Sequence, residues 1–244
     1  MRDYEKELGE RVAFIRGVMA EAHAKGLVFG NSGGKDSALV GILCSKASDN
    51  VLAVGLPCGS RRNFGEDLDD ARALADAYGI PMEVVDLSGV QREMLSAAGS
   101  AAELSAPAVA NIAPRLRMTA LYAVAQSRGA LVVGTGNRSE AYMGYFTKWG
   151  DGAYDLDPIA DLTVTEIYEF LRYLGAPEHI IKKAPSAGLF EGQTDEGEMG
   201  VTYAAVDRFL ATGEGDEREL EIISRAHAAT EHKRRPSRTY PDKG

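Results

Sequence analysis

Short apolar runs alternate with stretches of helical periodicity in the first half of the chain. The apolar runs predict strands at 27–30, 51–56, 82–87 and 130–134. Helical spacing predicts helices over 4–25, 36–46, about 66–78, 89–97 and about 114–127. Short apolar strands that each precede a helix are typical of a parallel sheet covered on both faces. We therefore expect an α/β fold with a doubly wound, parallel five-stranded, Rossmann-like sheet.

The pattern changes after residue 136. Residues 143–158 are rich in Gly, Asp and aromatic residues, and helices are expected at about 163–174, from Pro177, at 202–211 and at 216–230. Residues 185–200 hold four glycines with little periodicity, which predicts a mobile lid. No internal repeat or low-complexity linker is evident. The length suits one domain over residues 1–244.

The stretch 27–37, Leu-Val-Phe-Gly-Asn-Ser-Gly-Gly-Lys-Asp-Ser, joins a predicted strand to a predicted helix through small residues. Backbone N–H groups of such a loop can converge on an anion, and the helix adds its positive end. Lys35, Ser32 and Ser37 offer further donors, and Asp36 offers a carboxylate to a phosphate-bound Mg²⁺. The loop is not a Walker A motif, because Phe29 and Asp36 occupy positions that require Gly and Ser or Thr. An ordinary Gly-rich turn is the alternative.

A second polar segment, Gly-Thr-Gly-Asn-Arg-Ser-Glu at 134–140, follows the last predicted strand. Thr135 can reach a nucleotide from the strand end, and Glu140 can offer metal a second carboxylate beside Asp36. Ligands of parallel sheets bind at the carboxyl ends of the strands, where both segments open. A polar loop without a ligand remains an equal alternative for this segment alone.

Three more segments carry candidate binding residues. Residues 144–155 hold the only tryptophan, three further aromatics and Lys148, a combination that suits a flat, partly anionic ligand. Arg115 and Arg117 suit bidentate phosphate contact, although one of them could be a surface ion-pair partner. Residues 230–236, Thr-Glu-His-Lys-Arg-Arg-Pro, are on charge alone a solvated basic tail.

Composition narrows the class of protein. The chain is 45% hydrophobic and 26% charged, with no apolar run long enough to span a membrane. The polar N-terminus lacks the apolar core of a signal peptide, and Cys44 and Cys58 have no redox or metal-ligand spacing, so we expect a cytoplasmic protein with reduced thiols. The net charge of −9 disfavours a nucleic-acid partner.

The segment Ser32-Gly-Gly-Lys-Asp-Ser37 resembles the SGGxDS pyrophosphate loop of the N-type ATP pyrophosphatases, a superfamily of adenine nucleotide alpha hydrolase-like fold. With it, six further segments resemble the ammonia-dependent NAD synthetase family, in the family's order and across almost the whole chain: 111–118, 134–140, 144–159, 182–189, 192–200 and 231–236. The resemblance implies a homodimer that amidates deamido-NAD with ATP and ammonia. It further implies that AMP and pyrophosphate leave. The chain lacks the length for a glutaminase domain, so we expect free ammonia or an ammonia-donating partner protein.

The resemblance also implies roles for individual residues. It places ATP on Gly30, Asn31, Ser32, Gly33, Gly34, Lys35, Asp36, Ser37, Thr135 and Ser186, and Mg²⁺ on Asp36 and Glu140. Ser32, Lys35 and Asp36 are the expected catalytic residues, because they meet the departing pyrophosphate. The deamido-NAD residues would be Arg115, Lys148, Asp155, His232 and Lys233. The chain departs from the family at Val164, where a lysine usually touches ATP, and Lys182 or Lys183 could compensate.

Three other readings stay open. Within the superfamily, an adenylating amidotransferase subunit or a tRNA-thiolation enzyme would share the SGGxDS loop. The acidic pI of about 5.1 and the absence of paired reactive cysteines disfavour tRNA thiolation. A non-catalytic nucleotide-binding module would need neither Asp36 with Glu140 nor the acidic pair Asp195 and Glu196 in the lid.

Overall fold

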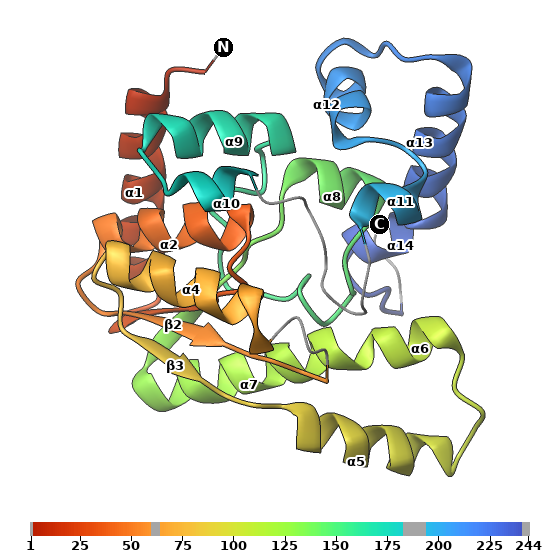
Figure 1. Ribbon diagram of the computed structural model, residues 1–244, viewed down its shortest axis with the longest axis horizontal. Coiled ribbons are helices and arrows are strands. Elements are labelled where there is room, and N and C mark those ends of the chain that lie inside the picture. The colour runs from red at the N-terminus through yellow and green to blue at the C-terminus, as the bar shows by residue number, and fades with distance from the viewer. Residues whose placement is uncertain (1, 60–63, 183–193, 241–244) are drawn as a thin grey trace.

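The computed structural model describes residues 2–59, 64–182 and 194–240 (Figure 1). Its centre is a parallel sheet in the order β3-β2-β1-β4. The strands are β1 (Gly26–Gly30), β2 (Val51–Gly55), β3 (Met82–Val84) and β4 (Ala130–Val133). Leu27 on β1 lies opposite Val51 on one side and Leu131 on the other, so β1 is a central strand. The α/β class and the parallel sheet are confirmed.

Helices follow each strand and form a second group near the C-terminus. They are α1 (Tyr4–Glu21), α2 (Lys35–Ala47), α4 (Glu66–Ala77), α5 (Ser88–Gly99), α6 (Ala106–Ala110), α7 (Ile112–Arg128), α8 (Arg138–Met143), α9 (Val164–Tyr173), α10 (Glu178–Lys182), α11 (Asp195–Met199), α12 (Tyr203–Thr212), α13 (Glu217–Ala229) and α14 (Glu231–Arg234). The expected helices are all present within a few residues. The sequence pattern did not predict α6, α8, α11 and α14, which are short.

The expected fifth strand is wrong for the part of the chain that the structure describes, where the sheet has four strands. A single parallel bridge between Val133 and Leu156 stands in its place beside β4. The side chains of Asp155 and Asp157, on either side of Leu156, accept hydrogen bonds from backbone N–H groups. In a longer strand pair, these N–H groups would bond to the backbone of the neighbouring strand. Asp155 Oδ2 accepts from Val132 N at 2.7 Å, and Asp157 Oδ2 accepts from Gly136 N at 3.0 Å.

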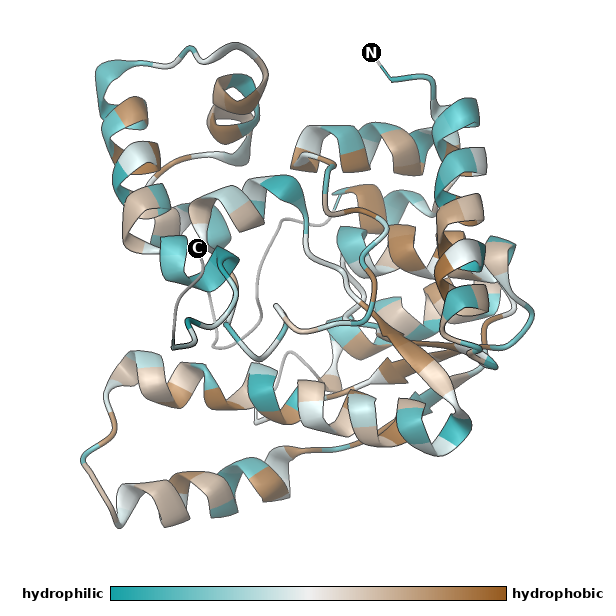
Figure 2. Cartoon of the chain, turned by 180° about the vertical axis from the view of Figure 1, so that it is seen from behind, coloured by the Kyte–Doolittle hydropathy of each residue, from teal (hydrophilic) through white to brown (hydrophobic). Residues whose placement is uncertain are grey.

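Alternation along the strands supplies two hydrophobic cores, one on each face of the sheet. Leu27 and Phe29 point into the core formed with α1, α2, α9 and α10, whereas Val28 points into the core formed with α7. All three side chains are at most 1% exposed. Figure 2 shows the apolar strands enclosed by helices that are polar on their outer faces. This burial holds the carboxyl ends of the strands in fixed positions.

The C-terminal helices form a separate hydrophobic cluster beside the sheet. It is built from Met143, Val201, Ala205, Val206 and Ile223, which join α8, α12 and α13. Because α8 starts just after β4, this cluster attaches the C-terminal helices to the carboxyl edge of the sheet (Figure 1). Within the described residues, no helix combines the length and apolar character that a bilayer span requires.

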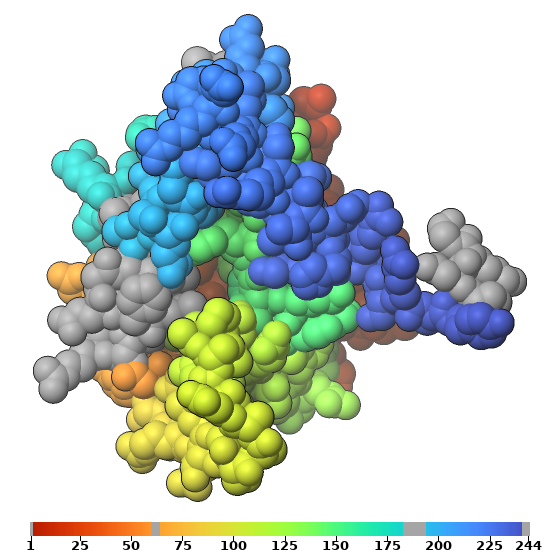
Figure 3. Space-filling view, turned by 90° about the vertical axis from the view of Figure 1, so that its right-hand side faces the viewer, coloured from red at the N-terminus to blue at the C-terminus, as the bar shows by residue number. Residues whose placement is uncertain are grey.

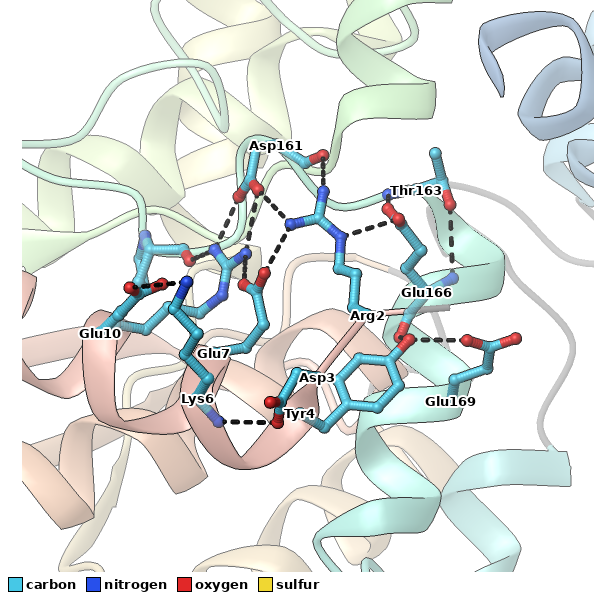
Figure 4. Close-up of polar contacts among 12 residues, drawn as sticks. Arg2, Asp3, Tyr4, Lys6, Glu7, Glu10, Asp161, Thr163, Glu166 and Glu169 are labelled. Atoms are coloured by element: carbon cyan, nitrogen blue, oxygen red, sulfur yellow. Dashed lines mark hydrogen bonds and ion pairs between the residues drawn. The ribbon is translucent and has the colours of Figure 1, made fainter. Parts of the chain in front are cut away.

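The N-terminus is fastened to the chain that follows β4 (Figure 4). Arg2 pairs with Asp161 at 2.9 Å and with Glu166 of α9 at 2.7 Å, while Arg11 pairs with Asp161 at 2.6 Å. Arg11 also donates to the Pro158 carbonyl. These contacts hold residues 158–166 against α1. They therefore also hold the preceding loop, in which Asp157 lies near the carboxyl ends of the strands.

Candidate active site

The loop between β1 and α2 has the form of an anion-binding turn. Gly33 has a φ of +70°, and a Cβ there would lie 2.3 Å from Asp67 O, so only glycine fits. Asn31 Nδ2 donates to Ala71 O at 2.9 Å, and Asn31 Oδ1 accepts from Gly33 N at 3.2 Å. Gly34 caps α2 without a side chain, which leaves the first turn of the helix open toward a ligand.

Two carboxylates that the sequence singled out lie beside this loop. Asp36 lies in the first turn of α2 and Glu140 in the first turn of α8. Asn137 links them, because its Nδ2 donates to Asp36 Oδ1 at 3.2 Å and its side chain forms a capping box with Glu140. Burial and the nearby charge of Asp36 raise the pKa of Glu140 well above its usual value, against the opposing effect of Lys35.

Lys35 lies between the carboxylates and the C-terminal helices. Its side chain is 5% exposed, and Nζ donates to Asp36 Oδ2 at 2.8 Å. Burial alone would lower the pKa of Lys35, but Asp36 and Glu140 outweigh it and hold the amine protonated. The same Nζ lies 5.6 Å from the centre of the Tyr203 ring, and Tyr203 donates its hydroxyl to Asp195 at 3.1 Å. This contact joins the loop to α11 and α12.

A cavity of about 1040 Å³ opens at these strand ends. In Figure 3 the segment after β4 (green) lies between the C-terminal helices (blue) and α6 (yellow-green), and all three border this cavity. Most expected ATP and metal residues line it: Gly30, Asn31, Ser32, Gly34, Lys35, Asp36, Ser37, Thr135 and Glu140. Lys233 lines it as well. Gly33 instead faces α4, where it shapes the loop.

The other expected deamido-NAD residues lie at the rim of the cavity. Arg115 Nε and Nη2 point to the Lys148 carbonyl at 3.4 and 3.3 Å, and Lys148 Nζ donates to the His232 carbonyl at 2.6 Å. Lys233 Nζ donates to the carbonyls of Gly144 and Phe146, each at 2.8 Å. The C-terminal segment is therefore docked beside the aromatic segment, and the interpretation as a solvated tail is wrong for residues 230–234.

Asp155 has a different environment. Its Oδ1 accepts from the Tyr122 hydroxyl at 3.2 Å, and its Oδ2 accepts from Val132 N. Both contacts are with protein groups at or beside β4. In this structure Asp155 therefore stabilises the edge of the sheet.

Two predictions concern the chain around α9 and beyond. Val164 is 4% exposed, its N–H donates to Ser139 Oγ at 3.2 Å, and it is not a lining residue of the cavity. Lys182 pairs with Glu178 at the surface at 2.9 Å. Ser186, Lys183 and the lid up to residue 193 lie outside the described residues. The end of the lid forms α11, from which Asp195 and Glu198 line the cavity.

The sequence left one contributor to the site undecided between two arginines and missed another. Arg117 lines the cavity and donates from Nε to the Leu56 carbonyl at 3.0 Å, at the end of β2. Arg115 and Arg117 were indistinguishable in the sequence, yet Arg117 faces inward and Arg115 lies at the exposed rim. Tyr203 had no sequence signal, because its link to Asp195 and Lys35 depends on the packing of α12.

Comparisons with known proteins agree with this geometry. The family model described as NAD synthase matches residues 7–240. The NH(3)-dependent NAD(+) synthetase of Carboxydothermus hydrogenoformans is 48% identical over 236 residues, which cover 96% of each chain. The solved NMN synthetase of Francisella tularensis has a TM-score of 0.92 and 36% identity, covering 98% of this chain and 99% of that one.

A second solved structure, the NH3-dependent NAD synthetase of Campylobacter jejuni, has a TM-score of 0.79 and 27% identity, again covering 98% and 99% of the two chains. The match extends from α1 to the end of the described chain, and therefore includes both strand-end loops and the docked C-terminal segment. The chain belongs to the NAD synthase family.

Proposed function

We propose that this protein, a C–N bond-forming ligase by family, amidates deamido-NAD to NAD with ATP and ammonia in the last step of NAD synthesis. The observation that carries the proposal is the convergence of the open α2 N-terminus, Lys35, Asp36 and Glu140 in one cavity. A carboxylate reacts poorly with ammonia until its oxygen becomes a good leaving group. Adenylation supplies that leaving group.

In the first step, a nicotinate carboxylate oxygen attacks the α-phosphorus of ATP and pyrophosphate leaves. Ser32, Ser37 and the first N–H groups of α2 would hold the β- and γ-phosphates. Lys35 would neutralise charge on the departing pyrophosphate from a position that water cannot reach freely. In the second step, ammonia attacks the acyl carbon and AMP leaves, so the protein mainly positions the two reactants.

Asp36 and Glu140 fit Mg²⁺. This ion is commonly bound by one or two carboxylates together with substrate phosphates and waters. The two carboxylates converge from different helices, and their mutual repulsion contributes to the raised pKa of Glu140, which a cation would relieve. When bound, Mg²⁺ would supply positive charge to the leaving pyrophosphate. Thr135 would contact the nucleotide from the end of β4.

Arg115, Lys148, His232 and Lys233 would hold the acid substrate at the rim, because its phosphates are anionic. The proposal also includes a homodimer. Three large apolar residues on β3 and α5 are 41–50% exposed, and a second copy of the chain could cover them: Val84, Val90 and Met94. Sedimentation of the purified protein tests this part.

Further parts of the proposal concern the nitrogen source, the partners, the cellular location and the number of domains. Ammonia is taken directly or from a donor protein, and neither a nucleic acid nor a membrane takes part. Cys44 and Cys58 are unpaired and buried, which is compatible with the expected cytoplasmic location. Residues spread between Gly30 and Arg234 line one cavity, which supports one domain over residues 1–244.

A second candidate substrate follows from the structural comparison. The Francisella tularensis protein, with a TM-score of 0.92, is an NMN synthetase. We infer nicotinic acid mononucleotide, the acid form of NMN, as a second candidate substrate for this protein. The same cavity chemistry would amidate either acid.

The test is incubation with ATP, Mg²⁺ and each acid, with and without ammonium, followed by assay of pyrophosphate and of the amide product. NAD formation that requires ammonium supports the main proposal. Absence of pyrophosphate release with either acid, in a protein that still binds ATP, would refute both candidates and favour the non-catalytic nucleotide-binding module.

A further inference from the structure

Trp149, the only tryptophan in the chain, has an unusual backbone and an exposed ring. Its φ is +64°, a left-handed conformation that bulky side chains rarely adopt. Its side chain is 54% exposed. An exposed indole on strained backbone contributes little to folding, and such strain tends to persist at ligand-binding positions.

The surrounding turn forces this conformation. Thr147 O accepts from Gly150 N at 2.9 Å, and Asp151 Oδ1 accepts from Thr147 N at 2.9 Å. Gly150 is pressed against α7, since a Cβ there would lie 2.9 Å from Pro114 Cβ. Thr147, Gly150 and Asp151 line the cavity, but Trp149 does not. The turn therefore presents the indole outward, at the rim.

Cationic and polar groups surround the indole. Lys148 Nζ lies 5.3 Å from the centre of the Trp149 ring and donates to the His232 carbonyl. Arg115 contacts the Lys148 carbonyl from α7. The rim thus combines two cations, suited to a pyrophosphate, with a flat aromatic surface, suited to a base.

The order of groups in the acid substrate matches this arrangement. The nicotinate carboxylate must meet the α-phosphate of ATP inside the cavity, near Lys35 and Asp36. The phosphates then lie outward at Arg115 and Lys148, and the adenosine of a dinucleotide lies beyond them. Nicotinic acid mononucleotide ends at its 5′-phosphate and has no adenine to stack on Trp149.

We propose that the Trp149 ring stacks on the adenine of deamido-NAD and so gives this protein a preference for the dinucleotide acid over the mononucleotide. The proposal rests on the amidation proposed above and names the group that selects between its two candidate substrates. Trp149 acts on binding only, because it lies away from the reacting atoms.

Because Trp149 is the only tryptophan, intrinsic fluorescence reports on it directly. Deamido-NAD should quench the emission of the wild-type protein, whereas nicotinic acid mononucleotide at saturation should leave it almost unchanged. Equal responses to the two acids would overturn the proposal. A ring buried between two copies of the chain would also overturn it, and would show as emission that changes on dilution but not with deamido-NAD.

Kinetics of Trp149→Ala provide a second measurement. The KM for deamido-NAD should rise roughly 5- to 150-fold, the range for loss of one base–aromatic stack. The KM for the mononucleotide and the kcat for both acids should stay unchanged. Trp149→Phe should keep most of the affinity, and Tyr240→Ala, which removes a fully exposed aromatic from the tail, is the matched control.

The two proposals fail in different ways. A wild-type protein that makes no amide from either acid refutes the amidation itself. A wild-type protein that makes NAD from deamido-NAD, together with an unchanged KM in Trp149→Ala, refutes only the stacking role. A wild-type preference for the mononucleotide also refutes the stacking role.

Discussion

Replacing Gly33 by alanine should disrupt the phosphate loop and destabilise the protein. The φ of +70° at Gly33 lies in the left-handed region, where a Cβ is disfavoured. A Cβ would also lie 2.3 Å from Asp67 O, 2.9 Å from Asp70 Cβ and 3.0 Å from Ala71 N, all on α4. Two of these three atoms belong to the backbone, so no side-chain rotation relieves the clash.

Two contributions add up to the loss of stability expected for Gly33→Ala. The left-handed conformation costs an alanine ~1–2 kcal/mol. Displacing packed atoms adds ~1–3 kcal/mol, by comparison with overpacked cores. The sum is ~2–5 kcal/mol, and for a chain of this size each kcal/mol lowers the Tm by roughly 2–4 °C. We therefore expect a fall of roughly 4–20 °C in Tm, together with a raised KM for ATP, because the loop must move.

Gly34→Ala is the matched control. Gly34 has a φ of −94°, and a Cβ there would meet only Ser32 Oγ, at 3.3 Å. Thermal unfolding of both variants and the wild type, each with and without ATP, measures the difference. If Gly33→Ala unfolds at the same temperature as Gly34→Ala, the close approach of α4 to the loop is not what requires glycine.

Three further predictions concern charged groups. Asp36→Asn should slow pyrophosphate release by roughly 30- to 1,000-fold, or ~2–4 kcal/mol of transition-state stabilisation, and should abolish any thermal shift caused by Mg²⁺; near-wild-type release by the folded variant would remove Asp36 from the metal site. Burial raises the pKa of Asp157 to about 7, so the native state holds an extra proton and stability falls as pH rises from about 4 to about 7. Asp157→Asn should flatten that part of a Tm–pH curve, and an unchanged slope would contradict the assignment. Truncation after Ala229 should raise the KM for deamido-NAD far more than that for ATP. Lys233→Ala should raise the same KM to a smaller extent, equivalent to ~1–3 kcal/mol of binding free energy. Unchanged KM values would limit residues 230–234 to a structural role.

The sequence predicted the sheet well because its strands are buried on both faces. Leu27, Val28 and Phe29 form a continuous apolar run, and each side chain has a core to enter. At Leu156, which forms a single bridge to Val133, the sequence pattern indicated no strand. Its neighbours Asp155 and Asp157 accept backbone hydrogen bonds through their side chains, which composition cannot distinguish from a polar loop.

Short helices were the main structural omission. The helix α8 has six residues, too few to display a period, and it is stabilised by the capping box between Asn137 and Glu140 and by the left-handed Gly144. The sequence showed Glu140 as a metal candidate but not as a cap. The structure shows the cap, because Glu140 Oε2 accepts from Asn137 N at 3.2 Å, and the charge of Asp36 acts on the same carboxyl group. The metal role stays a prediction.

The docking of the C-terminal segment could not be predicted from its charge. Charge alone favoured a solvated tail, yet Lys233 and Arg234 donate to carbonyl groups at and after the end of α8. Helix ends leave carbonyls without partners, and a basic side chain can satisfy them wherever the chain brings it close. The contacts join residues about ninety positions apart, so no local pattern could predict them.

The charge of the cavity supports the proposal that a cation takes part in the reaction. Among the described residues, the lining includes four basic side chains (Lys35, Arg117, Lys233 and Arg234) against six acidic ones (Asp36, Asp67, Glu140, Asp151, Asp195 and Glu198). Both proposed substrates are polyanions, and the whole chain carries −9. Backbone N–H groups and Lys35 attract phosphate locally, although acidic side chains outnumber basic ones in the described lining. The balance supports entry of ATP as its magnesium complex, with the ion shared between the phosphates and the pair Asp36 and Glu140.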